Sequence, residues 1–369
     1  MKTQFTLQSA DPSDVQIERF LRAQIENGEL KVGDRLPNTG DLVREWRVGF
    51  NTVNKVMRRL VSEGLLSRNR KRGTYVNSVQ KQVLIAVLVA PGLTDETAHF
   101  YRALLRAIRL RGRERRWLCR AYDGLNEFRA VSGFDHQAAC QYLRGDLRHY
   151  AFKGFVDLHS GWVRVAETHE NVPVARLGPT LAGAPYEVIL DFHRFGKESL
   201  RFLAGKGLRK IAYIRFGDPD FDDTMDLEGI RDEGRLLELP EVEIHQNRYP
   251  LSRRETLERQ AAEQTEKLLS VWRQRKEWPD ALLVSDDIAA RGVTGALLNS
   301  GGEEVRRLTV MVKTNEGIDH FYGMPVVRYD FSVQAVADAL LDVLNARIQG
   351  ETPPPLPVKI GGAIVAPPQ

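Results

Sequence analysis

The sequence predicts an α/β protein in which a small helical domain precedes a larger domain of two lobes with doubly wound parallel sheets. Residues 38–62 carry apolar side chains at three- and four-residue spacing, which is typical of amphipathic helices. From residue 81 onward, short apolar runs alternate with helical patterns, as in α/β folds. The chain of 369 residues is also too long for one small core. We therefore expect two domains, over residues 1–78 and 79–369.

Two adjacent helices are predicted in the first domain. Asn38 follows Pro37 and offers a side-chain oxygen as an N-cap, so the first helix is expected to begin there and to end near Gly49. The second is expected over residues 50–62, with an apolar face of Val53, Val56, Met57, Leu60 and Val61. Its outer face then carries amides and cations without a carboxylate, on Asn51, Asn54, Lys55, Arg58 and Arg59.

A cationic hairpin is predicted after these helices. Gly64 breaks the second helix, and residues 65–68 and 74–77 read as short strands joined by a turn that contains Arg70, Lys71 and Arg72. Residues 1–78 hold 14 Lys/Arg and 9 Asp/Glu, a net charge of +5, whereas the remainder holds 39 and 40, a net of −1. This local basicity suits a surface that displaces counterions from a phosphate backbone. The alternative, an ordinary helical domain with solvated charges, does not explain why cap, spacing and cationic turn occur together.

Four stretches of this domain follow a known pattern: GDRLP at 33–37, VGFNTV at 48–53, LVSEGLL at 60–66 and KRGTYV at 71–76. They resemble the winged helix-turn-helix of the GntR family of bacterial transcription regulators. The resemblance implies that Arg35 contacts a phosphate or guanine, that Asn51 and Thr52 meet the major groove or phosphates, and that Arg72 and Gly73 bring the wing to the minor groove. The remaining candidates for DNA contact are Asn38, Phe50, Asn54, Lys55, Arg58, Lys71 and Thr74.

The start of the second helix departs from the GntR pattern. Gly49 and Phe50 stand where the family has serine and arginine, so a weaker cap and an apolar ring replace a cap and a cation. Phe50 either contacts a thymine methyl or packs into the domain, and packing is the favoured interpretation.

Parallel strands covered by helices are predicted in the second domain. Residues 83–90 form a continuous apolar run, as expected of a strand that is buried on both faces. Further strands are expected over residues 117–122, 154–158, 172–177, 187–190, 210–215, 281–285, 309–312 and 326–329. Helices are expected over residues 100–111, 195–206, 255–275, 288–299 and 333–348.

The second domain follows the pattern of a second family in three stretches, at residues 188–212, 279–292 and 329–350. From about residue 82 to 366 it resembles the periplasmic-binding-protein-like effector domain of LacI/GalR-type regulators. Ligands of such folds bind at the carboxyl ends of strands. The candidate ligand-binding residues are Asp123, His159, Ser160, Phe192, Arg215, Asp226, Asp287, Lys313, Asn315 and Asp330.

At two positions the charge differs from the family pattern. Asp226 stands where the resemblance implies a sugar-binding arginine. The stretch from Val312 to Asn315 stands where the family has an aspartate that contacts the sugar, and it carries no carboxylate. We interpret this as favouring a cationic or otherwise substituted effector over a neutral sugar.

Several classes of protein are not indicated by the sequence. Residues 1–369 contain neither a run of about 18 apolar residues nor a secretory leader pattern, so a cytoplasmic protein is expected. Cys119 and Cys140 lack metal-type spacing, and the eight histidines form no metal motif, so no metal or cofactor is expected. An enzyme of the kind in which a GntR domain is fused to an aminotransferase would need a phosphate-binding loop that we do not find.

These observations predict a sequence-specific transcription regulator, with repressor favoured over activator. It is expected to bind a palindromic DNA operator as a homodimer and to be controlled by a sugar-like small molecule between the lobes. The alternative is a ligand-independent DNA-binding protein whose α/β domain serves dimerisation only.

Overall fold

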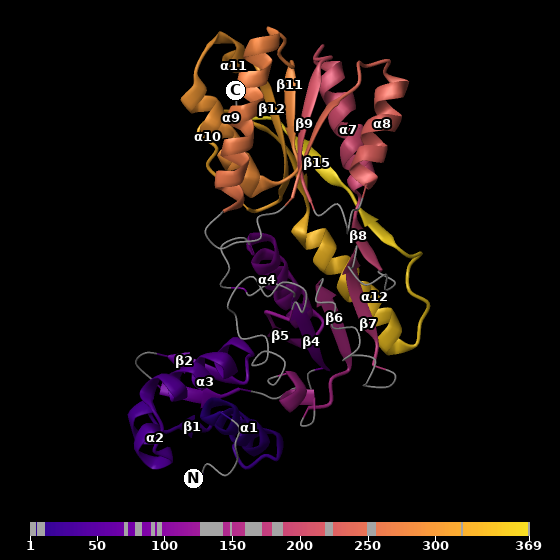
Figure 1. The fold of residues 1–369 in the computed structure, drawn as a ribbon. Coiled ribbons are helices and arrows are strands. Elements are labelled where there is room, and N and C mark those ends of the chain that lie inside the picture. Colours follow the sequence, from indigo (N-terminus) through magenta and orange to yellow (C-terminus); the bar gives the residue numbers. More distant parts are fainter. Residues whose placement is uncertain are drawn as a thin grey trace. The chain divides into compact units, whose positions relative to one another are not determined.

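The computed structural model describes residues 5, 12–69, 73–77, 83–89, 93, 98–125, 143–147, 150–158, 172–178, 187–217, 224–248, 256–318 and 320–367 (Figure 1). The chain divides into two compact units. Unit 1 comprises Met1–Val83 with Arg116–Cys119, and unit 2 comprises Leu84–Arg115 with Arg120–Gln369.

Unit 1 contains three helices and a small sheet among its described residues. The helices are α1 (Ser13–Glu26), α2 (Thr39–Trp46) and α3 (Phe50–Ser62). The strands β1 (Arg35–Leu36), β3 (Gly73–Val76) and β2 (Leu66–Asn69) form an antiparallel sheet in that order. The helices and the sheet enclose one core, in which Ile17, Leu21, Leu42, Val53 and Leu60 are fully buried. The predicted winged helix-turn-helix architecture is confirmed.

Local signals explain where these helices begin and end. Asn38 Oδ1 accepts a hydrogen bond from the backbone N–H of Asp41 at 2.9 Å, so it caps α2 as predicted. The helix ends at Trp46, earlier than expected, because Arg47 takes a left-handed conformation with φ of 55°. Gly64 adopts φ of 77° after α3, a conformation that glycine takes without strain.

The first of two six-stranded sheets has the order β14-β8-β7-β6-β4-β5. Its strands are β14 (Val358–Ile360), β8 (Val188–Leu190), β7 (Val174–Gly178), β6 (Gly154–Leu158), β4 (Val83–Val89) and β5 (Trp117–Tyr122). Neighbouring strands from β14 to β4 pair in parallel. Two helices pack together beside it, α4 (His99–Glu114) and α12 (Val333–Gln349).

The second sheet has the order β10-β9-β11-β12-β13-β15. Its strands are β10 (Glu243–Asn247), β9 (Ile211–Phe216), β11 (Ala281–Val284), β12 (Thr309–Asn315), β13 (Val327–Phe331) and β15 (Gly362–Val365). The strand β15 pairs antiparallel with β13, so this sheet is not wholly parallel as the sequence suggested. β15 follows β14 of the first sheet after Gly361 alone, so it joins the edge of the second sheet beside β13 without a crossover helix, and no crossover is needed for an antiparallel neighbour.

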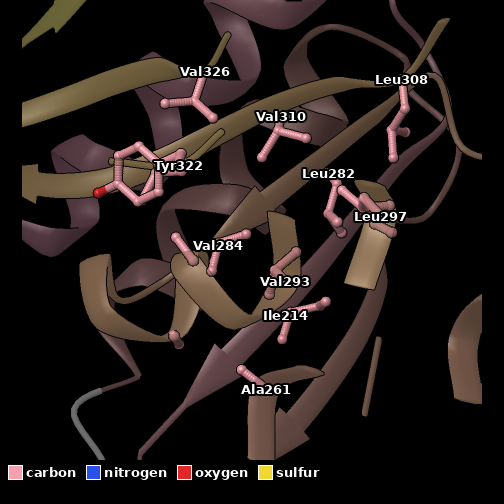
Figure 2. Close-up of a cluster of buried hydrophobic side chains, with 14 of the residues drawn as sticks. Ile214, Ala261, Leu282, Val284, Val293, Leu297, Leu308, Val310, Tyr322 and Val326 are labelled. Carbon is pink, nitrogen blue, oxygen red and sulfur yellow. The ribbon is translucent and has the colours of Figure 1, made fainter. Parts of the chain in front are cut away.

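Helices cover both faces of the second sheet. On one face, α7 (Phe192–Gly205) packs with α8 (Met225–Leu236), and on the other α9 (Leu257–Arg275) packs with α10 (Asp287–Ser300). The short helix α11 (Glu303–Arg307) follows α10. Figure 2 shows the core beneath α9 and α10, where Ile214, Leu282, Val284, Val293 and Val310 interlock. The predicted doubly wound architecture is therefore confirmed.

Close approach of helix backbones depends on glycine. A Cβ added to Gly292 in α10 would lie 1.8 Å from the carbonyl oxygen of Glu258 in α9. A Cβ on Gly229 in α8 would lie 2.1 Å from the carbonyl oxygen of His193 in α7. These glycines hold each helix pair at backbone contact and so fix where the helices meet the strand ends. None of the helices described by the structure is long and apolar enough to cross a membrane.

Candidate nucleic-acid interface and effector site

The helix α3 buries one face and exposes another. Its buried face comprises Val53, Val56, Met57 and Leu60. Asn51 and Arg58 are exposed and Thr52 and Asn54 half-buried, on a helix without a carboxylate in its sequence. Gly49 precedes α3 in an extended conformation and supplies no side-chain cap, so the first-turn N–H groups have no capping side chain. This face offers amide and cationic donors to an anionic partner.

Phe50 is the clearest error of the sequence analysis in this unit. The interpretation that it packs into the domain is wrong, because its side chain is 55% exposed. Phe50 continues the three- and four-residue spacing of Val53 and Met57, a pattern that would place it on the buried face of the helix. As the first residue of α3, however, it lies beyond the edge of the core that those two residues enter.

Two cations of α3 are engaged within the domain. Arg59, predicted on the outer face, turns inward: its Nη1 lies 2.6 Å from Oε2 of Glu18, which is almost fully buried in α1. That prediction is wrong because a buried carboxylate requires a counter-charge. Lys55 Nζ lies 2.7 Å from Asp14 Oδ2 but stays largely exposed. Only the second of these cations remains on the outer face.

Arg68 in β2 joins the wing to both helices and was not among the predicted residues. Its Nη1 donates to Asn54 Oδ1 at 3.0 Å, and its Nη2 donates to Thr39 Oγ1 at 3.0 Å. The amide carbonyl of Asn54 thereby accepts from Arg68, and its amino group carries two further donors. Arg68 follows Leu65 and Leu66 by two residues, and nothing in this sequence pattern indicates that it joins β2 to the two helices.

Arg35 and Gly73 meet where β1 pairs with β3. A Cβ on Gly73 would lie 2.8 Å from Arg35 Nε, so the absence of a side chain leaves room for the guanidinium. Thr74 in β3 pairs with Leu36 on one side and with Arg68 on the other. Lys71 and Arg72, also predicted to contact DNA, lie outside the described residues.

In unit 2, polar side chains gather at the carboxyl ends of the second sheet's strands. At the end of β9, Arg215 Nε donates to Asp226 Oδ2 at 2.9 Å, and the Tyr213 hydroxyl donates to the same oxygen at 2.5 Å. Arg215 Nη1 also donates to Gln246 at 2.7 Å. Asp226 is thus a buried, internally neutralised carboxylate, which removes it as a free partner for a cationic effector.

Lys313 lies in β12 with its ammonium over an aromatic ring. The Nζ atom is 4.2 Å from the ring centroid of Phe192, a separation at which cation–π attraction operates. Burial lowers the pKa of Lys313, and the charges of Asp226 and Asp286 oppose that shift. The sequence analysis placed Lys313 and Phe192 among the candidates, and the structure brings them together.

Two adjacent carboxylates begin α10. Asp286 Oδ1 caps the helix by accepting from the N–H groups of Ile288 and Ala289 at 2.9 Å each. Burial, followed by the charge of Asp287, raises the pKa of Asp286 to about 6. Asp287, a predicted candidate, also lies at this helix start, where the backbone N–H groups favour negative charge.

A histidine pair lies beside Asp287. The rings of His99 in α4 and His320 are perpendicular, with centroids 5.2 Å apart, and His320 Nε2 lies 3.4 Å from Asp287 Oδ2. Burial, then the Arg102 guanidinium, lowers the pKa of His99. Within the described part of the chain, His320 Nε2 and the Tyr322 hydroxyl are buried without a hydrogen-bond partner. None of these three rings was predicted from the sequence.

The remaining candidates are more dispersed. Asp330 in β13 pairs with Arg328 at 3.2 Å and accepts from Thr314, and Asn315 ends β12. Asp123 accepts from the backbone N–H of Leu93 at 2.7 Å, so its carboxylate is engaged within the protein. His159 and Ser160 fall outside the part of the chain that the structure describes. No group of residues able to hold a metal ion occurs among the described residues.

Comparison with known families matches each unit separately. Residues 14–76 match the model of bacterial regulatory proteins of the gntR family. The chain therefore carries a gntR-family DNA-binding domain. Residues 200–366 match the model of a periplasmic binding protein-like domain. Both resemblances predicted from the sequence are confirmed. The matched family is described as bacterial regulatory proteins and the relatives are named as transcriptional repressors, which agrees with the prediction of a regulator.

The gntR-family domain also has curated relatives. It is 39% identical over 70 residues to the HTH-type transcriptional repressor NagR of Bacillus subtilis, covering 19% of this chain and 29% of that protein. It is 43% identical over 61 residues to the mannosyl-D-glycerate transport/metabolism system repressor MngR of Escherichia coli, covering 16% and 25%. The chain thus spans less than a third of either relative.

Solved structures resemble most of this chain in fold. A LacI family transcriptional regulator from Arthrobacter, in complex with lactose, superposes with a TM-score of 0.59 at 16% identity, covering 78% of this chain and 98% of that one. A complex of the transcriptional regulator CelR with cellobiose gives 0.58 at 17% identity, covering 88% and 93%. At this identity the likeness establishes the LacI-type fold alone.

Proposed function

We propose that this gntR-family protein is a transcription regulator that binds a palindromic operator as a homodimer. The observation that carries the proposal is the outer face of α3, where exposed Asn51 and Arg58 lie on a helix without carboxylates. Arg35 over Gly73 supplies a further cation at the sheet. A helix with this surface fits the major groove, and a twofold dimer presents two of them to a palindrome.

The ligand side of the proposal rests on unit 2. We propose that a small, sugar-like effector binds between the lobes at the strand ends that carry Arg215, Asp287 and Lys313, with His320 and Tyr322 beside them. The Tyr322 hydroxyl is buried without a hydrogen-bond partner among the described residues, and a hydroxyl-bearing ligand would satisfy it. The neighbouring His320 Nε2 already has the Asp287 carboxylate at 3.4 Å. The lactose and cellobiose complexes of proteins with this fold support a carbohydrate.

Repression is the proposed sign of regulation, because the relatives NagR and MngR are named as repressors. In this mechanism the effector binds one conformation of the lobes more tightly than another and so changes the DNA affinity of the dimer.

DNA binding is tested by selecting duplexes from a randomised library with the full chain. We expect a palindromic sequence to be enriched, with affinity that falls steeply with salt. Replacing Arg58 with alanine is expected to weaken binding, whereas Arg307→Ala, an exposed arginine of α11, should leave it unchanged. A library that yields no enriched duplex would refute the proposed function.

Effector binding is tested by a thermal-shift screen against neutral sugars, sugar acids, amino sugars and polyols. A true ligand shifts the midpoint in proportion to its excess over the dissociation constant, and the shift should be lost in Lys313→Met. The hit should then change the affinity for the selected duplex. If no compound shifts the midpoint while the duplex is still bound, the alternative of a ligand-independent DNA-binding protein is favoured.

A further inference from the structure

Phe50 presents an aromatic ring to solvent at the position where a recognition helix begins. Phe50 as a whole is 55% exposed, and the four core residues of α3, Val53, Val56, Met57 and Leu60, are almost fully buried. Exposed rings of this size lose contact with water favourably when a partner covers them. Phe50 is therefore a surface group that gains free energy from an apolar partner of suitable size.

Polar groups surround this ring. Asn51 is exposed, Thr52 is half-buried, and the N–H groups of the first turn have no side-chain cap. Arg68 donates to the Asn54 side-chain carbonyl, so this amide is held in place with the donors of its amino group uncommitted to Arg68. The surface is thus a single apolar ring among hydrogen-bond donors, on a helix with exposed cations. A flat apolar protein partner does not match this composition, whereas a polyanion does.

The major groove of DNA offers this combination. Its base edges carry many acceptors, and its characteristic apolar group is the C5 methyl of thymine. Residues at the amino end of a recognition helix are those that reach the base edges. We propose that Phe50 reads a thymine methyl in each operator half-site, so that sequence preference at this position is for thymine. The proposal rests on the proposed DNA-binding function and specifies the base that one residue selects.

The experiment uses the full chain and the duplex selected from the randomised library. Each thymine of the half-site is replaced in turn, symmetrically, by deoxyuridine, which removes only the C5 methyl. We expect one position at which the dissociation constant rises about fourfold per half-site, the size expected from losing one buried methyl group. Other thymines should show little change.

Variants of Phe50 connect this effect to the ring. In Phe50→Ala the difference between thymine and deoxyuridine at that position should disappear, while Phe50→Leu, which keeps an apolar contact, should retain part of it. Leu236→Ala serves as the matched control, because Leu236 in α8 is an exposed apolar side chain at 70% exposure outside unit 1. It should leave the full difference in place.

Each outcome decides the question. Loss of the thymine preference in Phe50→Ala alone supports the proposal. If a duplex is selected and bound but no position is sensitive to the methyl, or if Phe50→Ala keeps the same sensitivity, the assignment to Phe50 is overturned while DNA binding stands. If the library yields no duplex, the proposed function fails together with it.

Discussion

Arg215 and Asp226 form an ion pair that is buried on both sides. Nε of Arg215 lies 2.9 Å from Oδ2 of Asp226, and both side chains are less than a tenth exposed. From the sequence, Asp226 was interpreted as an acid in place of a sugar-binding arginine and therefore as a site for a cation. In the structure the arginine comes from the neighbouring strand β9 instead, so a guanidinium is still present at this strand end.

Breaking this pair should destabilise the protein strongly. Arg215→Met leaves the Asp226 charge buried without its partner, and we expect a loss of about 3–5 kcal/mol in the free energy of unfolding. Adding Asp226→Asn should recover much of it, since the buried charge is removed. Urea unfolding followed by tryptophan fluorescence measures both.

The matched control for this pair is Arg307→Met. Arg307 pairs with Glu303 on the surface, with both side chains more than two-thirds exposed. Such pairs contribute about 0–1 kcal/mol. Equal losses in Arg215→Met and Arg307→Met would contradict the description of the Arg215–Asp226 pair.

The spacing of apolar residues predicted the helices and strands that bury one continuous apolar face. The range 50–62 for α3 was predicted to the residue, because its apolar spacing ends at Gly64. Strand β10 was missed because its residues Glu243–Asn247 alternate in exposure along an edge and carry little apolar signal. Helix α8 was also missed, since its sequence is dominated by charged residues and two glycines.

The candidate sites were predictable where position in the fold dictates chemistry. Lys313 and Arg215 follow from the rule that ligands meet strand ends. The pair His99 and His320 could not be found in this way, because one ring lies on α4 and the other in a loop more than 200 residues later. Arg59 was misplaced because its partner Glu18 is on another helix, and only tertiary packing brings the two together.

Gly73 should be required for DNA binding beyond its role in the turn. It has φ of 109°, and an alanine methyl there would displace the Arg35 guanidinium from its place 2.8 Å away. We expect Gly73→Ala to weaken operator binding about tenfold or more, since a displaced phosphate or base contact is worth roughly 1–3 kcal/mol. Fluorescence anisotropy with the selected duplex measures the effect.

Gly64→Ala is the control that distinguishes backbone strain at a positive φ from displacement of the Arg35 side chain. Gly64 also has positive φ, at 77°, but nothing lies within 4 Å of a Cβ there. Its replacement should lower thermal stability with DNA affinity largely retained. If both variants lose affinity equally, displacement of Arg35 is not the cause.

Two glycines of α10 should respond in opposite directions to alanine. At Gly292 the added methyl meets the Glu258 carbonyl oxygen at 1.8 Å, so α9 and α10 must separate, at a cost of about 1–3 kcal/mol or more. At Gly295 nothing lies within 4 Å, and alanine should stabilise the helix by up to about 1 kcal/mol. Thermal unfolding of the two variants measures this contrast, and stabilisation by Gly292→Ala would contradict the packing described.

Asp286 should make stability depend on pH between about 4 and 6. Its pKa rises from 3.8 to about 6 in the folded protein, because burial and the neighbouring Asp287 disfavour its charge. Below the lower value the group is protonated in both states and imposes no penalty. As the pH rises from about 4 to 6, the unfolded state ionises before the folded state does, so the folded state loses stability relative to it, and above 6 the penalty is complete.

Asp286→Asn removes this titration while keeping an oxygen to cap α10. The free energy of unfolding of the variant should therefore exceed that of the native protein increasingly as the pH rises. The difference should be small near pH 4 and on the order of 1–3 kcal/mol at pH 7. Urea unfolding at both pH values measures the difference. Asp342→Asn is the control, since that carboxylate is 60% exposed and should show no comparable gain. A native protein that is stabilised relative to Asp286→Asn as the pH rises would reverse the sign and refute the burial of this charge.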